Sequence, residues 1–293
     1  MQLAGIILIA FVPVLTYAQT ADARPTFDVA SIKPSDPTAG FLRWNGGPGT
    51  KDPGLFTCEN CSLITLLSMA YEVPHYRISA PDWTQNTKFV VSAKVPAGAT
   101  KEQFLVMMQN MLAVRFKLAV HREQKEMQTY DLVIAKGGPK LRRSADEAPA
   151  KDDVAETAPK RPQPTELPKM GKDGYPILPE GYSEVAMEGR QRIMYPGQTM
   201  QWFAGRMSSQ LGCPVTDLTG LTWKYDFALF WAYGASNDRS AITSDTPPAG
   251  ADSDPGPTLV EAVQSQLGLK LIPKKETVEI IAVDHVEKVP TEN

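Results

Sequence analysis

The chain has 293 residues, 42% of them hydrophobic and 22% charged, which is ordinary globular composition with room for one large or two smaller cores. The formal net charge of −3 is too small to favour nucleic acid or an anionic membrane surface as a partner. The 25 prolines are concentrated in two stretches, which indicates linkers between folded parts.

Residues 1–23 have the features of a secretory signal peptide. An uncharged apolar run from Leu3 to Leu15 is too short to span a bilayer, and small residues such as Ala18 and Ala23 follow it. We expect cleavage after one of these alanines and a mature protein that is periplasmic or secreted, with no membrane span. A buried amino-terminal helix is the alternative.

Two stretches of the remaining chain resemble each other and predict an internal repeat. Each copy reads helix, strand, strand, helix, strand, strand, over residues 24–141 and 191–293, and an extra strand precedes the first copy at 27–34. The clearest matches are 62–71 with 199–208, 88–95 with 224–231, and 116–123 with 269–276. We therefore predict an α+β fold of two similar lobes, each an antiparallel sheet carrying two helices.

The apolar spacing of these segments also predicts which side chains are buried. Thr199 is expected to cap one helix, and Thr100 with Gln103 to form a capping box on another. The predicted core consists of Leu63, Leu66, Leu67, Phe104, Met108, Leu112, Phe116, Leu118, Met200, Phe203, Val263, Leu267, Leu269 and Ile280.

Two segments have too few apolar residues for a core of their own. Residues 142–190 are rich in proline and charge and predict a linker between the copies. Residues 233–257 interrupt the second copy and predict a mobile insert.

Cys58 and Cys61 form a CxxC motif, and Cys213 is alone. In an oxidising compartment the close pair is a possible disulfide, although the same spacing occurs in thiol oxidoreductases. A zinc site would need a second pair of ligands, and the sequence has neither another CxxC nor an HxxxH. The sequence therefore predicts no metal site.

His121 has two glutamates shortly after it and is the most evident candidate for catalysis. Strand alternation places it with Lys117, Ala119 and Glu123 on the polar face, opposite Phe116, Leu118 and Val120. The matching position in the second copy is Lys274, beside Lys275 and Glu276. We therefore interpret His121 as part of a solvated sheet surface whose carboxylates raise its pKa, and not as a catalytic residue.

No nucleophile lies at a fixed spacing from His75, and Asp284 and His285 are neighbours on opposite faces of a strand. The chain contains no GxSxG, HExxH, GxxxxGK[ST] or strand-following GxGxxG motif. The sequence thus predicts no catalytic residues and no cofactor.

Five segments together resemble an uncharacterised, soil-associated bacterial family, a domain of unknown function that usually occurs in many copies per genome. They are "FDVASIKPS" (27–35), residues 62–83, residues 115–141, "PVTDLTGLTWKYDFAL" (214–229), and residues 267–290. The resemblance implies export and a mixed α and β architecture, and no activity. Some members are attached to membrane metallopeptidases of the antibiotic-sensor type, which suggests a sensory or binding role.

Three functions are compatible with these observations. The first is an extracytoplasmic binding or interaction module for an unknown protein, peptide or glycan, docking through sheet edges. The second is a hydrolase of carbohydrate or cell-wall polymers that uses a carboxylate pair, with Trp44, Trp83 or Trp231 stacking on sugars. The third is a thiol redox protein that uses Cys58 and Cys61. We favour the binding module over an enzyme.

Overall fold

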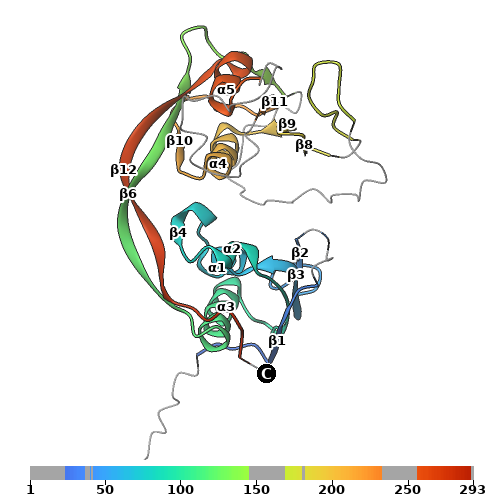
Figure 1. The fold of residues 1–293 in the computed structure, drawn as a ribbon, viewed down its shortest axis with the longest axis vertical. Coiled ribbons are helices and arrows are strands. Elements are labelled where there is room, and N and C mark those ends of the chain that lie inside the picture. The colour runs from blue at the N-terminus through green and yellow to red at the C-terminus, as the bar shows by residue number, and fades with distance from the viewer. Residues whose placement is uncertain are drawn as a thin grey trace, which may run out of the picture. The chain divides into compact units, whose positions relative to one another are not determined.

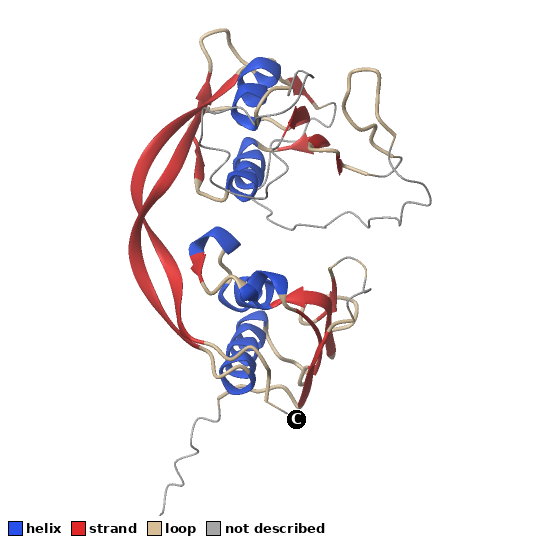
Figure 2. Ribbon diagram, in the orientation of Figure 1, coloured by secondary structure: helices blue, strands red, loops and turns tan. Residues whose placement is uncertain are grey.

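The structure is a computed structural model that describes residues 24–36, 40, 42–144, 169–179, 182–232 and 256–291. The predicted signal peptide and almost all of the insert at 233–257 lie outside these residues. The fold is α+β, as the sequence predicts, with helices and sheets distributed along the whole described chain (Figures 1 and 2). The chain forms two compact units, unit 1 from 1–62, 87–118 and 287–293, and unit 2 from 63–86 and 119–286.

Unit 1 contains an antiparallel sheet and one long helix. The sheet, here sheet A, has the strand order β1 (Val29–Pro34), β5 (Lys88–Lys94), β3 (Leu55–Ser62) and β2 (Arg43–Gly46). In β5 the buried positions alternate strictly, with Phe89, Val91 and Ala93 inward, because successive side chains of a strand point to opposite faces.

The helix of unit 1, α3 (Lys101–Arg115), begins with the predicted capping box. Thr100 accepts a hydrogen bond from the Gln103 amide, and the Gln103 side chain accepts one from the Thr100 amide. One turn in, the ring of Phe104 lies 5.2 Å from that of Phe56 in an edge arrangement. The capping box thus begins α3 at a position from which Phe104, on the apolar face of the helix, packs against Phe56 of sheet A.

Unit 2 contains the remaining elements. Its helices are α1 (Leu63–Tyr71), the short 3₁₀ helix η1 (His75–Arg77), α2 (Trp83–Asn86), α4 (Met200–Leu211) and α5 (Leu259–Leu267). Its strands are β4 (Ile78–Ser79), β6 (Ala119–Ile134), β7 (Arg142–Arg143), β8 (Glu184–Met187), β9 (Arg190–Gln198), β10 (Val215–Asp217), β11 (Tyr225–Ala232) and β12 (Leu269–His285).

These strands form two sheets. Sheet C is antiparallel with the order β7-β11-β9-β8, and sheet B is mixed with the order β10-β6-β12-β4. In sheet B, β6 and β12 are antiparallel along nearly their whole length, from Leu269 opposite Ile134 to His285 opposite Ala119. Strands β10 and β4 pair in parallel with β6 and β12, respectively, so each long strand has a short neighbour from a distant part of the chain.

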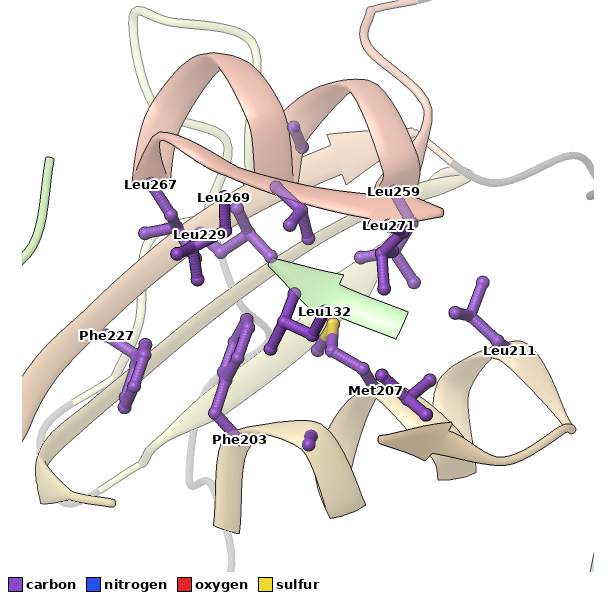
Figure 3. Packing of buried hydrophobic residues seen from close by; sticks show 14 of the residues in the cluster. Leu132, Phe203, Met207, Leu211, Phe227, Leu229, Leu259, Leu267, Leu269 and Leu271 are labelled. Carbon is purple, nitrogen blue, oxygen red and sulfur yellow. The ribbon is translucent and has the colours of Figure 1, made fainter. Parts of the chain in front are cut away.

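The core of unit 2 lies where α4 and α5 meet β11, β6 and β12 (Figure 3). Phe203 of α4 stacks on Phe227 of β11 with ring centroids 4.4 Å apart. Leu132 of β6 and Leu269 of β12 are fully buried in the same cluster. Across both units, every side chain of the predicted core is buried, and the predicted cap Thr199 accepts from the Trp202 amide.

Two details of the sequence prediction are wrong. The two final strands predicted in each copy are one long strand, because residues 124–129 contain no turn-forming glycine or proline and continue the ladder with residues 274–279. The predicted linker at 142–190 holds ordered structure at both ends: β7, a turn at 169–177, and β8. β7 and β8 are the edge strands of sheet C, and the turn packs on that sheet through Tyr175.

Candidate functional site

Strands β6 and β12 form a long ribbon in unit 2 (Figure 1), and many of its side chains are exposed. In the described chain, β10 covers the outer edge of β6 only at 130–132, and β4 covers that of β12 only at 281–282. The six residues 121–126 of β6 are all exposed. A two-stranded ribbon is marginally stable in water by itself, so contacts between its side chains matter for holding it together.

One cluster of charged side chains surrounds His121. Its Nδ1 lies 2.8 and 3.0 Å from the two carboxylate oxygens of Asp284 on the opposite strand, and its Nε2 lies 3.6 Å from Glu123. The hydrogen bond to Asp284 is the main reason why the pKa of His121 is raised, and Glu123 adds a smaller contribution. The imidazolium therefore links the two strands at the ribbon surface.

A second cluster surrounds Lys274 in the same way. Its Nζ lies 2.7 Å from Asp131 on the opposite strand and 2.9 Å from Glu276 on its own strand. Asp131 and then Glu276 raise the pKa of Lys274, while Lys274 lowers the pKa of Glu276. The cation again joins the strands.

The two clusters consist of equivalent residues in the two stretches that the sequence predicts to be a repeat. The same sequence offset relates His121 to Lys274, Glu123 to Glu276, and Asp131 to Asp284. In both, the cation meets the carboxylate two residues along its own strand and an aspartate diagonally across the ladder. Lysine cannot act as histidine does in acid–base chemistry near neutral pH, which supports the interpretation of His121 as a strand-linking residue.

The aspartates of both clusters, Asp131 and Asp284, do not stand out as candidate site residues in the sequence. Asp284 was assigned only as a neighbour of His285, because the partner across an antiparallel ladder depends on a register between distant strands. One pattern could have pointed to them: Asp131 and Asp284 are related by the same sequence offset as His121 and Lys274.

The outer edge of β6 carries backbone groups that face away from β12. The Tyr130 amide donates to Pro214, and Leu132 accepts from the Leu218 amide, both toward β10. Because alternate residues of a strand direct both backbone groups to one side, Val120, Gln124 and the other even-numbered residues of β6 face this edge too. Outside 130–132, no strand of the described chain pairs with it.

The outer edge of β12 differs at one position. There the Glu279 carbonyl accepts from Nε of Arg77 at 2.7 Å, so odd-numbered residues face outward. Pro273 is one of them and has no N–H to offer a further strand. The residue of β6 at the sequence offset that relates Lys274 to His121 is Val120, which retains its N–H. The two edges are therefore not equally able to accept another strand.

Cys58 and Cys61 are joined as a disulfide within β3, at an irregularity in its ladder with β5. Both residues are fully buried. A thiol oxidoreductase needs an accessible sulfur for exchange, so this geometry is that of a structural bridge. Cys213 is a buried free thiol, and burial raises its pKa to about 11.

The other candidate residues occupy separate elements. His75 begins η1 and His285 ends β12. Of the tryptophans, Trp231 is buried in the core, Trp83 begins α2, and Trp44 on β2 is 54% exposed. Within the described residues, no group of three or more His, Cys, Asp or Glu side chains is placed to hold a metal ion.

The turn at 169–177 covers part of the outer face of sheet C. Tyr175 is 4% exposed and lies 4.5 Å from the ring of Phe230 on β11. The guanidinium of Arg190 lies 5.1 Å above the Tyr175 ring and donates to the Gly174 carbonyl. Asp173 pairs with Arg192, which lowers the pKa of this carboxyl. An aromatic ring and a carboxylate together anchor this turn, which we call the cap turn.

The match to a family covers most of this fold. Residues 64–286 match the family described as "Protein of unknown function (DUF3738)", and the chain belongs to it. No curated protein and no solved structure matches the chain significantly. Among the described helices, none is both long and apolar enough to cross a membrane.

Proposed function

We propose that this protein is an extracytoplasmic interaction module that binds an extended segment of a partner protein along the outer edge of β6. The observation that carries the proposal is the row of outward-facing backbone groups from Val120 to Gln128, which no described strand pairs with. A strand added there would gain main-chain hydrogen bonds, while the alternating side chains would select its sequence.

The composition of this edge supports selective binding over self-association. Arg122, Lys125 and Glu126 are exposed charged residues of this edge strand, and charges on an edge strand discourage pairing between identical copies. On β12, Pro273 blocks the corresponding position. At this position β12 has no N–H for an added strand, whereas β6 has one.

The extracytoplasmic location rests on the apolar run at residues 3–15 with its small-residue cleavage sites. Such a location is consistent with the Cys58–Cys61 disulfide, because disulfides persist in oxidising compartments.

We also infer that the two repeats descend from a duplicated unit. Sheets A and C share the strand order when β1, β5, β3 and β2 are matched to β7, β11, β9 and β8. The two ribbon clusters match residue by residue, and β4 and β10 exchange between the copies in the same manner. A functional consequence follows: the edge with Val120 and the edge with Pro273 are diverged versions of one ancestral edge.

The test uses Val120→Pro, which places a proline where the other copy already has one. Selection of extended peptides from a displayed library should yield binders to the wild type whose affinity falls at least about tenfold in Val120→Pro. Val120→Ala, which keeps the N–H, should stay within about twofold, and circular dichroism should show that all variants are folded. Pro273→Val should open a second edge and increase the number of peptides bound per chain.

Failure to select any binder would sink this proposal. Binders that tolerate Val120→Pro would show that the protein binds partners at another surface.

A further inference from the structure

The outer face of sheet A is built from rows of side chains that run across its strands. In one row, Lys94 of β5 lies between Val29 of β1 and Leu55 of β3, and in another, Val90 lies opposite Lys33. Val29 is 65%, Leu55 39% and Val90 37% exposed. Apolar and cationic side chains are thus exposed side by side on one sheet face.

The same rows exist on sheet C, where the chain covers them itself. Aligning "KFVVSAKV" with "KYDFALFW" matches Lys94 to Phe230, and the ladder partners of these residues are Leu55 and Arg192. Each sheet therefore has a cation opposite a large apolar side chain. On sheet A the cation is on β5 and the apolar residue on β3, whereas on sheet C the cation is on β9 and the apolar residue on β11. On sheet C the cap turn seats Tyr175 against Phe230 and Asp173 against Arg192.

The charges of the sheet A face define what would be complementary to it. Lys33 and Lys94 lie on this face, as does Lys88 on the same strand as Lys94. Asp28 lies 3.9 Å from Lys94, and both side chains of this pair are largely exposed. An exposed pair of this kind contributes little, so a carboxylate of a ligand can compete with Asp28 for Lys94.

We propose that the outer face of sheet A docks a partner-protein segment that carries a carboxylate close to an aromatic residue. The carboxylate would pair with Lys94 or Lys33, and the ring would cover Val29, Leu55 and Val90. On sheet C the cap turn provides the same two groups: Tyr175 packs on Phe230, and Asp173 pairs with Arg192. The inference adds a second surface to the proposed interaction module and names the chemistry of its partner; its test does not involve the edge of β6.

The probe is a peptide with the sequence of residues 169–177, the chain's own cap turn. Within the protein that turn is attached close to sheet C at high effective concentration, so an added peptide should reach the open face of sheet A instead. Titration followed by amide chemical shifts should perturb β1, β3 and β5. Peptides with alanine for the tyrosine, or asparagine for the aspartate, should bind more weakly.

Two protein variants separate this face from the rest of the molecule. Leu55→Glu and Lys94→Glu change exposed side chains and should each weaken peptide binding about tenfold. Lys136→Glu, an equal charge reversal on an exposed turn of unit 2, should leave binding unchanged, and so should Val120→Pro. Loss of binding in Val120→Pro but not in Leu55→Glu would assign the peptide to the β6 edge and overturn this inference alone.

Other outcomes also overturn it. These are the absence of any shift in sheet A, displacement of the cap turn from sheet C by the peptide, and concentration-dependent self-association that Leu55→Glu abolishes. The last would assign the face to a second copy of the chain.

Discussion

Sheets A and C have the same order of strands and bury the same alternate positions of β5 and β11, yet their outer faces differ. On sheet C the cap turn buries Tyr175 on Phe230, whereas on sheet A the side chains of Val29, Leu55 and Val90 remain exposed. An exposed apolar side chain contributes little to the stability of the sheet, and a group of such side chains often marks a binding surface. Two sheets with matching strand orders can thus bury the same alternate positions and still differ in what covers their outer faces.

The largest effect expected from this difference concerns Tyr175. Tyr175→Ala should lower the free energy of local unfolding of sheet C by about 3 kcal/mol, because it removes a buried ring. Leu55→Ala on sheet A should cost less, about 1 kcal/mol, because that side chain is already 39% exposed. Hydrogen exchange of β11 and β5 amides measures each sheet separately, which is needed in a protein of two units. Equal costs would remove the distinction between the faces.

A smaller effect is expected from the carboxylate of the cap turn. Arg192 lowers the pKa of Asp173. The ionised Asp173 therefore stabilises the fold fully above pH 3.8, its ordinary pKa, and this stabilisation is lost as the pH falls through the lowered pKa. Asp173→Asn should remove at most about 0.5 kcal/mol near neutral pH, because the carboxylate is largely exposed. Asp28→Asn on sheet A is the matched control and should not loosen the cap turn. Exchange of the Tyr175 amide between pH 2 and about 7 provides the measurement.

The smallest effect is expected in the ribbon of β6 and β12, where the clusters around His121 and Lys274 are alike. Asp284→Asn should lower the pKa of His121 toward its ordinary value of 6.5, and Glu123→Gln should lower it less. Since the folded pKa is raised, the stabilising contribution of His121 is fully present below pH 6.5 and is lost as the pH rises through the raised value. An NMR titration of the imidazole measures both shifts. A His121 pKa unaffected by Asp284→Asn would contradict the geometry of the cluster.

The sequence predicted the local parts of the fold well. The spacing of apolar residues in the helices identified buried side chains such as Met108 and Val263, and the Thr100–Gln103 pattern identified a helix start. These predictions succeed because burial periodicity and capping depend on residues within a few positions of one another.

Strand pairing was less predictable. Alternation assigned His121 to a polar face but could not show that Asp284 lies beside it, since that contact depends on the register of two strands far apart in the chain. The same reason explains why β6 and β12 were each predicted as two strands: the partner that keeps residues 124–129 extended is distant in sequence.

The ordered cap turn was missed for a related reason. Its segment has too few apolar residues to indicate a core, and Tyr175 becomes buried only because Phe230 and Arg190 are already positioned by sheet C.

The sequence by itself determined the α+β class and the interior side chains, because each follows from short-range patterns of hydrophobicity. The tertiary structure alone decided that β10 pairs with β6 and β4 with β12, and which edge and sheet face are left uncovered. It also decided that Asp284 lies beside His121 and Asp131 beside Lys274. These features arise from contacts between distant residues, whose geometry no local pattern specifies.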